Sequence, residues 1–307
     1  MEFVLQTNGL TKSYRGNRVL NGVTMNVRRG DIYGFVGENG SGKTTVIRLI
    51  TGLIHAESGE FSLFGVDSKS PDILKARAKI GAIVESPSIY LNMSAKDNLI
   101  MQCTILGIND LEKCKQTLTT VGLGELWGSK KHAGDFSLGM RQRLGIAMSL
   151  LGNPEFIILD EPMNGLDPAG IVGIRELILR LNRDHGITFL ISSHILTELA
   201  LVANRYGIIS RGALIQEISS SELEKVCTHS TEIKTDNRNK LVDVLAPYFD
   251  NTKMFLLDDG VRIEADIDLN DVLSKIISQD IKILSVNTHR SSIEEHYLSM
   301  MGGNKNA

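Results

Sequence analysis

The sequence predicts an α/β domain built around a phosphate-binding loop, followed by a smaller α+β domain. Residues 37–45 read Gly-Glu-Asn-Gly-Ser-Gly-Lys-Thr-Thr and complete the pattern G-x-x-x-x-G-K-[ST]. An apolar run at residues 32–36 precedes the pattern, and an apolar-periodic stretch at residues 46–53 follows it. Strand, loop and helix in this order indicate a nucleotide site rather than an ordinary glycine-rich turn.

The residue types of this loop suit a polyphosphate. Glycines permit dihedrals and a close backbone approach that a Cβ would block, and successive N–H groups can then point into one concavity. Lys43 supplies a point charge for the outer phosphates, and the Thr44 hydroxyl is placed to bind Mg²⁺. The candidate nucleotide-binding residues of the loop are Gly37, Glu38, Asn39, Gly40, Ser41, Gly42, Lys43, Thr44 and Thr45.

Composition excludes several classes of function. The 307 residues are 42% hydrophobic with a net charge of −3, which is ordinary for a globular protein and gives no basic footprint for nucleic acid. The N-terminus lacks a signal-peptide pattern, and no apolar stretch reaches the ~18 residues that a membrane span needs. Three cysteines without metal spacing indicate buried free thiols. We therefore expect a cytoplasmic protein whose membrane role, if any, depends on a partner.

The N-terminal segments read as half-buried strands, residues 3–6 and 19–27, joined by a turn-rich segment at residues 9–16. Tyr14 in that segment could stack on a nucleotide base or pack on its own hairpin, and its position upstream of a phosphate loop favours stacking. A further strand at residues 80–84 ends at Glu85-Ser86-Pro87, where the proline requires an extended exit.

Two acidic residues follow the apolar run 156–159. Substrates bind at the carboxyl ends of strands in open α/β sheets, so Asp160 and Glu161 are candidates to hold Mg²⁺ and to polarise water. Another strand, residues 188–191, leads to His194 at the same expected edge, which favours a contact with the γ-phosphate over a structural role. Between them, Asp167 and Pro168 form a typical helix start.

Helical patterns occupy residues 94–122, and a further helix runs from residue 137 to 151. Ser137 and Gly139 lie where the N–H groups of that helix are free. This helix start is either a second anion site or a capped helix end, and capping is favoured from these residues alone.

A change in composition after Ser219-Ser220-Ser221 predicts a domain boundary, giving domains at residues 1–220 and 221–307. The second domain reads strand, helix, strand, strand, helix, strand, which is the order of a split βαβ, ferredoxin-like unit. These elements are expected at residues 232–235, 240–249, 253–257, 261–265, 269–278 and 281–286, with a last helix at 291–301.

Together, the motifs of residues 3–218 resemble the ATP-binding subunit of an ABC (ATP-binding cassette) transporter. The resemblance implies a RecA-like core, an antiparallel β subdomain and an α-helical subdomain at about residues 88–152. Residues 37–44 match the Walker A motif, residues 156–160 match Walker B, and residues 164–167 match the D-loop. The resemblance implies that Glu161 is the general base and that His194 and Lys43 are further catalytic residues. It also implies that Tyr14 is the aromatic residue that stacks on the base.

The signature motif of this family corresponds to residues 137–140. Leu138 replaces a glycine and Met140 replaces a glutamine, whereas Ser137 and Gly139, which face phosphate in the family, are kept. The resemblance therefore moves the interpretation of this helix start from capping to phosphate binding.

Glu85 stands where the family normally has a glutamine that touches Mg²⁺. A glutamate there resembles the subgroup that exports, or gives immunity to, bacitracin-type and lantibiotic peptides, although it could also be drift without bearing on substrate. A carboxylate keeps an oxygen ligand and loses the N–H donors of the amide. The predicted metal ligands are Thr44, Glu85 and Asp160.

The resemblance implies ATP and Mg²⁺ as cofactors, a homodimer that closes head to tail over two nucleotides, and a transmembrane permease as partner. It places the protein on the cytoplasmic face of a bacterial membrane, with no nucleic acid partner. Export of a drug, lipid or ion stays open. A soluble ABC ATPase of translation or repair is a further alternative, which the single cassette and the short distance between the Walker A and B motifs disfavour. Glu161 and His194 argue against a non-hydrolysing nucleotide-binding regulator.

Overall fold

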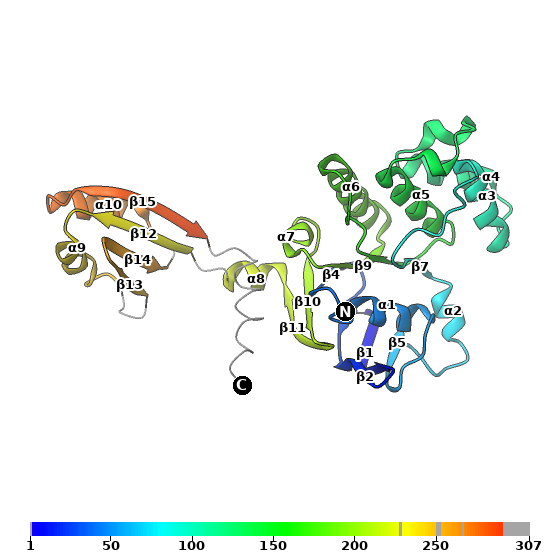
Figure 1. Cartoon of the computed structure of the whole chain (residues 1–307), viewed down its shortest axis with the longest axis horizontal. Helices are drawn as coiled ribbons and strands as arrows, with labels where there is room; N and C mark the ends of the chain where they lie inside the picture. Colours follow the sequence, from blue (N-terminus) through cyan, green and yellow to red (C-terminus); the bar gives the residue numbers. More distant parts are fainter. Residues whose placement is uncertain (1, 227–228, 250–252, 266, 291–307) are drawn as a thin grey trace. The chain divides into compact units, whose positions relative to one another are not determined.

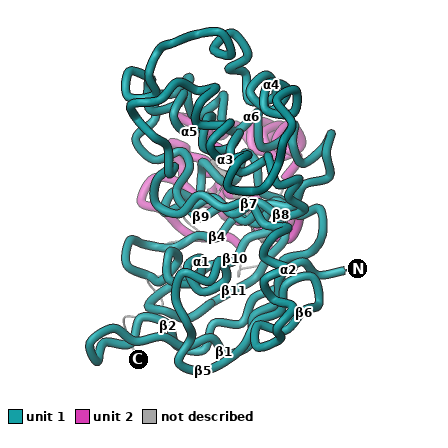
Figure 2. The backbone as a smooth tube through the Cα atoms, turned by 90° about the vertical axis from the view of Figure 1, so that its right-hand side faces the viewer, with its two compact units in different colours: residues 1–220 teal, residues 221–307 magenta. Residues whose placement is uncertain are grey.

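A computed structural model gives the fold shown in Figure 1 and describes residues 2–226, 229–249, 253–265 and 267–290. The chain divides after Ser220 into two compact units, which Figure 2 distinguishes by colour. Each unit is described by itself.

The first unit contains a six-stranded sheet in the order β11-β10-β4-β9-β8-β7. All neighbouring strands are parallel except the β10–β11 hairpin. The central strands β4, β9 and β8 are buried along their whole length, as expected for strands covered on both faces. Their bounds are β4 Ile32–Val36, β7 Ile80–Ile83, β8 Phe156–Asp160, β9 Thr188–Ser193, β10 Arg205–Ser210 and β11 Ala213–Ser219.

A second, antiparallel sheet has the order β2-β1-β5-β6, with β3 also paired to β1. Its strands are β1 Phe3–Tyr14, β2 Asn17–Val23, β3 Asn26–Arg28, β5 Ser58–Leu63 and β6 Val66–Asp67. Helix α1 (Lys43–Thr51) lies between the two sheets (Figures 1 and 2), because its apolar side chains join one core with residues of both. This core fixes the helix that begins at the phosphate loop.

The predicted turn at residues 9–16 is wrong, because most of this segment belongs to β1. Gly9 has a φ of 62° and lies at a break in the strand register, so it forms an irregularity within the strand instead of ending it. The reversal occurs only at Arg15 and Gly16. Tyr14 is consequently the last residue of a strand. The single strand predicted at 19–27 is also divided, into β2 and β3.

Further helices pack on the face of the six-stranded sheet opposite α1 (Figure 1). Helices α3 (Ala95–Ile105), α4 (Leu111–Thr120) and α5 (Leu138–Leu150), with two short 3₁₀ segments at Gly124–Gly128 and Ala133–Asp135, fill the predicted helical region 88–152. Helix α6 (Pro168–His185) begins at the predicted cap Asp167 and ends at Gly186, which has a φ of 65°. Short helices α2 (Ile73–Arg77) and α7 (Leu196–Leu199) complete the unit.

In the second unit, the predicted ferredoxin-like order is confirmed. Its sheet runs β13-β14-β12-β15 with antiparallel neighbours, and α9 and α10 share a core with it. Helix α8 (Ser220–Val226) begins at the last residue of the first unit. The elements that follow it are β12 His229–Thr235, α9 Arg238–Leu245, β13 Met254–Leu257, β14 Gly260–Glu264, α10 Leu269–Ser278 and β15 Ile283–Arg290. The last predicted helix, residues 291–301, lies outside the described residues.

Candidate functional site

The phosphate loop connects β4 to α1 in a conformation that only glycine adopts easily. Gly40 and Gly42 have φ values of 82° and 110°. A Cβ on Gly42 would lie 2.5 Å from Cδ2 of Leu20, and one on Gly37 would lie 2.4 Å from the carbonyl oxygen of Ile209. The glycines of the motif are therefore required by both backbone dihedrals and close packing.

A hairpin turn from elsewhere in the chain supports the loop. The N–H of Gly212, between β10 and β11, donates to the carbonyl oxygen of Ser41 at 3.0 Å, and the Gly212 carbonyl accepts from the Asn21 N–H at 2.7 Å. The Ser41 hydroxyl is buried and has no hydrogen-bond partner among the described residues. A buried polar atom without a partner costs free energy, so this loop fits a polar ligand such as a phosphate.

The Lys43 side chain is buried and folds back over its own loop. Its ammonium donates to the carbonyl oxygens of Gly37 at 2.6 Å and Glu38 at 3.2 Å, and it lies 3.3 Å from Oε1 of Glu161. The ammonium thus connects the loop to the acidic end of β8.

Asp160, at the end of β8, is held on both carboxylate oxygens. Thr44 Oγ1 donates to Oδ2 at 2.8 Å, and Ser192 Oγ donates to Oδ1 at 2.5 Å. No group of three or more histidine, cysteine or acidic side chains with metal-binding geometry occurs in the described residues. The Thr44–Asp160 pair nevertheless fits Mg²⁺, because this ion is commonly bound by one or two protein oxygens together with phosphates and water.

Glu161 has a φ of 50°, in the left-handed region that side chains rarely adopt. Its carboxylate lies between two basic groups, with Oε2 at 2.8 Å from His194 Nδ1 and Oε1 facing Lys43. The structure therefore brings the three predicted catalytic residues, Lys43, Glu161 and His194, together at the carboxyl ends of β4, β8 and β9.

Glu85 lies apart from this group. It follows β7 with a φ of 63°, and its side chain is 61% exposed and forms an ion pair with Arg48, one helical turn beyond Thr44. The predicted metal ligand is thus paired with an arginine of α1 in this structure. Its left-handed backbone was not foreseen from the sequence.

The remaining predicted nucleotide contacts are separate from the loop. Tyr14 ends β1 and is 39% exposed, and its ring centroid lies 5.8 Å from the Lys12 ammonium. Ser137 is the N-cap of α5, where its hydroxyl accepts the Met140 N–H at 3.2 Å, and it is exposed. In the part of the chain that the structure describes, the hydrogen bonds of Ser137 stay within its own helix. Gly139 lies beside the D-loop, near Leu166.

Sequence analysis missed Ser192, Gly212 and Glu198. A serine at the end of an apolar strand and a glycine in a hairpin carry no pattern of their own, so only the fold identifies them. Glu198 of α7 follows His194 by four residues, which is a readable signal. Burial raises the pKa of its carboxyl group, the charge of His194 opposes this, and the charge of Glu161 adds to it.

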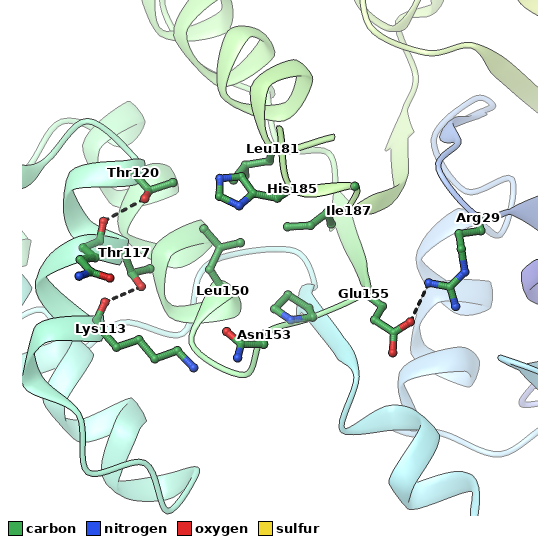
Figure 3. Close-up of a pocket in the computed structure, with 13 residues that line it drawn as sticks. Arg29, Lys113, Thr117, Thr120, Leu150, Asn153, Glu155, Leu181, His185 and Ile187 are labelled. Carbon is green, nitrogen blue, oxygen red and sulfur yellow. Dashed lines mark hydrogen bonds and ion pairs between the residues drawn. The ribbon is translucent and has the colours of Figure 1, made fainter. Parts of the chain in front are cut away.

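A cavity of about 490 Å³ at the opposite edge of the sheet is separate from this site. Figure 3 shows its lining, which includes Lys113, Asn153, Glu155, His185 and Ile187. Glu155 and Ile187 immediately precede β8 and β9, so the cavity lies at the amino ends of these strands. It contains none of the predicted site residues.

Comparison with known proteins gives a consistent result. The model of the ABC transporter family matches residues 20–164, and a model described as AAA domain, putative AbiEii toxin, Type IV TA system matches residues 132–200. The bacitracin transport ATP-binding protein BcrA of Bacillus licheniformis is 39% identical over 99% of both chains. The lantibiotic transport ATP-binding protein SrtF of Streptococcus pyogenes is 42% identical over 70% of this chain and 90% of its own.

Solved structures share the fold of the first unit. The cbiO1 protein of Clostridium perfringens, part of the ABC transporter complex cbiONQ, matches with a TM-score of 0.65 and 25% identity, over 73% of this chain and 91% of that chain. A nucleotide-free ATP-binding cassette matches with the same TM-score and 27% identity, over 73% and 94% of the two chains. Among the described residues, no helix combines the length and the apolar character that a membrane crossing requires.

Proposed function

Because the chain belongs to the ATP-binding subunits of ABC transporters, we propose that it hydrolyses ATP to power a permease that exports, or gives immunity to, an antimicrobial peptide. One observation carries the hydrolytic part of this proposal. Glu161, at the tip of a buried strand, faces both the ammonium of the phosphate loop and an imidazole.

Each residue has a definite task. The N–H groups of residues 37–45 and the Lys43 ammonium bind the phosphates, and Thr44 and Asp160 would hold Mg²⁺. When bound, the cation would neutralise charge on the phosphate oxygens. Glu161 accepts a proton from, or orients, the attacking water, and His194 binds the γ-phosphate and keeps the Glu161 carboxylate in place.

The catalytic site becomes complete in a homodimer. Ser137, which is exposed, and Gly139, which is half-buried, lie at the N-terminus of α5, where backbone N–H donors lack helical partners. A second copy placed head to tail supplies these donors to the γ-phosphate, so ATP favours the closed dimer. In this arrangement Tyr14 stacks on the adenine of the same nucleotide.

The permease docks on the helical region. A groove of about 320 Å³ is lined by the strand and loop around Glu85 and by α3 and α5, including Ile83, Pro87, Gln102, Leu106 and Gly145. In this proposal the groove receives short helices of a membrane-spanning partner, and the subunit acts at the cytoplasmic face of the membrane. Glu85 would be available as a metal ligand only after its ion pair with Arg48 opens.

The substrate class comes from the likeness to BcrA and SrtF, whose names specify bacitracin and lantibiotic transport. The proposal is tested by expressing the subunit together with its neighbouring genes in a susceptible bacterium. We expect bacitracin or a lantibiotic to be tolerated at a several-fold higher concentration, and Glu161→Gln to abolish that gain. ATP hydrolysis without any gain in tolerance would support the proposed ATPase activity but refute the proposed substrate. The transporter would then act on another substrate, such as a drug, lipid or ion.

A further inference from the structure

Ser192 connects the two acidic residues of the site through one hydroxyl group. It is the fifth residue of β9, its side chain is fully buried, and no motif includes it. Its Oγ donates to Asp160 Oδ1 at 2.5 Å and accepts the backbone N–H of Glu161 at 2.9 Å. Asp160 at the end of β8 and the following residue Glu161 are therefore both hydrogen-bonded to one side chain of the neighbouring strand β9.

The direction of these bonds is fixed by chemistry. A backbone N–H can only donate, so the bond from Glu161 occupies a lone pair of the hydroxyl oxygen. The single hydroxyl proton is then available to Asp160. The resulting hydrogen bond holds Oδ1 away from solvent, while Oδ2 faces Thr44. One carboxylate oxygen of Asp160 is thus reserved for Ser192, and the orientation of the other is fixed.

The same hydroxyl also stabilises an unfavourable backbone conformation. Glu161 adopts a φ of 50°, which costs free energy for a residue with a side chain. Its N–H is anchored on Ser192, and this anchor directs the side chain toward Lys43 and His194. Loss of the hydroxyl would release the peptide between Asp160 and Glu161 and leave a buried carboxylate oxygen without a donor.

We infer that Ser192 is a positioning residue that fixes the metal-binding carboxylate of Asp160 and the catalytic carboxylate of Glu161 relative to each other. This inference rests on the proposed function of the site. The Ser192 hydroxyl contributes to Mg²⁺-dependent nucleotide binding through Asp160 and to turnover through Glu161. It does not contribute to nucleotide binding in the absence of Mg²⁺.

The test compares Ser192→Ala with two matched variants in the full-length chain. Ser192→Thr keeps the hydroxyl. Ser193→Ala removes a neighbouring buried hydroxyl, which accepts the Ile195 N–H at 3.0 Å instead of contacting either acid. The readouts are kcat and KM for ATP, the melting temperature, and the affinity for a non-hydrolysable ATP analogue with Mg²⁺ and with EDTA, measured by calorimetry.

For Ser192→Ala we expect kcat to fall about tenfold, as for a lost hydrogen bond to a charged group, and KM for ATP with Mg²⁺ to rise as the Mg²⁺-dependent affinity falls. The gain in analogue affinity on adding Mg²⁺ should shrink by about the same factor, while affinity in EDTA stays within twofold. Ser192→Thr should recover most of both losses, and Ser193→Ala should show neither.

The inference is overturned if Ser192→Ala keeps kcat and the Mg²⁺ gain within twofold of the wild type. It is equally overturned if Ser193→Ala loses as much, because a general packing role would then suffice. Failure of the proposed function has a different signature, namely equal rates for the wild type and Glu161→Gln. In that case the calorimetric comparison with and without Mg²⁺ still decides the role of Ser192.

Discussion

The imidazole of His194 and the carboxylate of Glu161 are joined at 2.8 Å, from Nδ1 to Oε2, although 33 residues separate them. This contact orients one oxygen of the carboxylate, and Lys43 faces the other. A carboxylate with both oxygens facing basic groups has a fixed orientation, which suits it to orient or deprotonate water.

Glu161→Gln should lower ATP turnover by at least about a hundredfold, because an amide cannot accept the proton. ATP binding should persist, since the phosphate loop is intact, and the variant should accumulate as an ATP-bound dimer. Steady-state hydrolysis and light scattering with and without ATP measure the two effects. Normal hydrolysis in this variant would remove Glu161 from its proposed role.

Ser137 offers a way to separate helix capping from nucleotide contact. Asparagine and aspartate both cap helices well, so Ser137→Asn and Ser137→Asp should each keep stability within about 1 kcal/mol. Only Ser137→Asp places a negative charge against the partner's γ-phosphate, and it should prevent ATP-dependent dimerisation in the Glu161→Gln background. Equal dimerisation by both variants would refute the proposed contact across the dimer.

Gly42→Ala should disrupt the phosphate loop. Its φ of 110° is unfavourable for alanine, and the new Cβ would lie 2.5 Å from Cδ2 of Leu20. We expect a loss of stability of about 1–3 kcal/mol and ATP affinity reduced at least tenfold, measured by urea unfolding and calorimetry. Gly128→Ala is a suitable control, because open space surrounds that glycine and it does not adopt a positive φ.

Glu85→Gln should leave the stability of the chain nearly unchanged. The Glu85 and Arg48 side chains are 61% and 35% exposed, and exposed ion pairs contribute about 0–1 kcal/mol. Arg48→Gln should have an equally small effect in chemical unfolding. A loss above about 2 kcal/mol in either variant would show that this pair is more than a surface interaction.

The thiol of Cys114 should make stability fall at alkaline pH. It is fully buried beside the Cys103 thiol, with 2.8 Å between the sulfur atoms. Burial, with the hydrogen bond to Cys103, raises the pKa of the Cys114 thiol from 9.0 to about 12. Because the folded-state pKa is raised, the contribution is complete below about pH 9 and is lost as the thiol ionises first in the unfolded chain.

Urea unfolding at pH 8 and pH 10 measures this effect, with Cys114→Ala as the reference that removes it. The wild type should lose more stability than the variant over this interval, by at most about 1.4 kcal/mol per pH unit. Identical losses in the two proteins would contradict burial of a protonated thiol.

Much of the fold could be predicted from the sequence because its central strands are buried on both faces. Such strands read as uninterrupted apolar runs, as in residues 156–159, and their polar ends mark the functional edge. Asp167 and Pro168 likewise signal a helix start through local chemistry alone. Gly9 was misread because a glycine with positive φ serves a strand irregularity as well as a turn.

The contacts between the site residues were harder to predict from the sequence than the residues themselves. The pairing of Glu85 with Arg48 depends on how β7 lies against α1, and the bonds of Ser192 depend on the register between β8 and β9. Neither relation leaves a periodic pattern in the chain. Side chains with evident chemistry are therefore predictable from the sequence, while the residues that orient them are identified only by the fold.

The hydrogen bonds around Asp160 also bear on how the protein is made. Thr44 and Asp160 are 116 positions apart, and Ser192 comes another 32 positions later. During synthesis the phosphate loop leaves the ribosome on the order of ten seconds before these partners exist. A nascent chain that ends before β9 therefore lacks these contacts at the phosphate loop and cannot retain nucleotide. ATP can stabilise the subunit only after β9 has been translated.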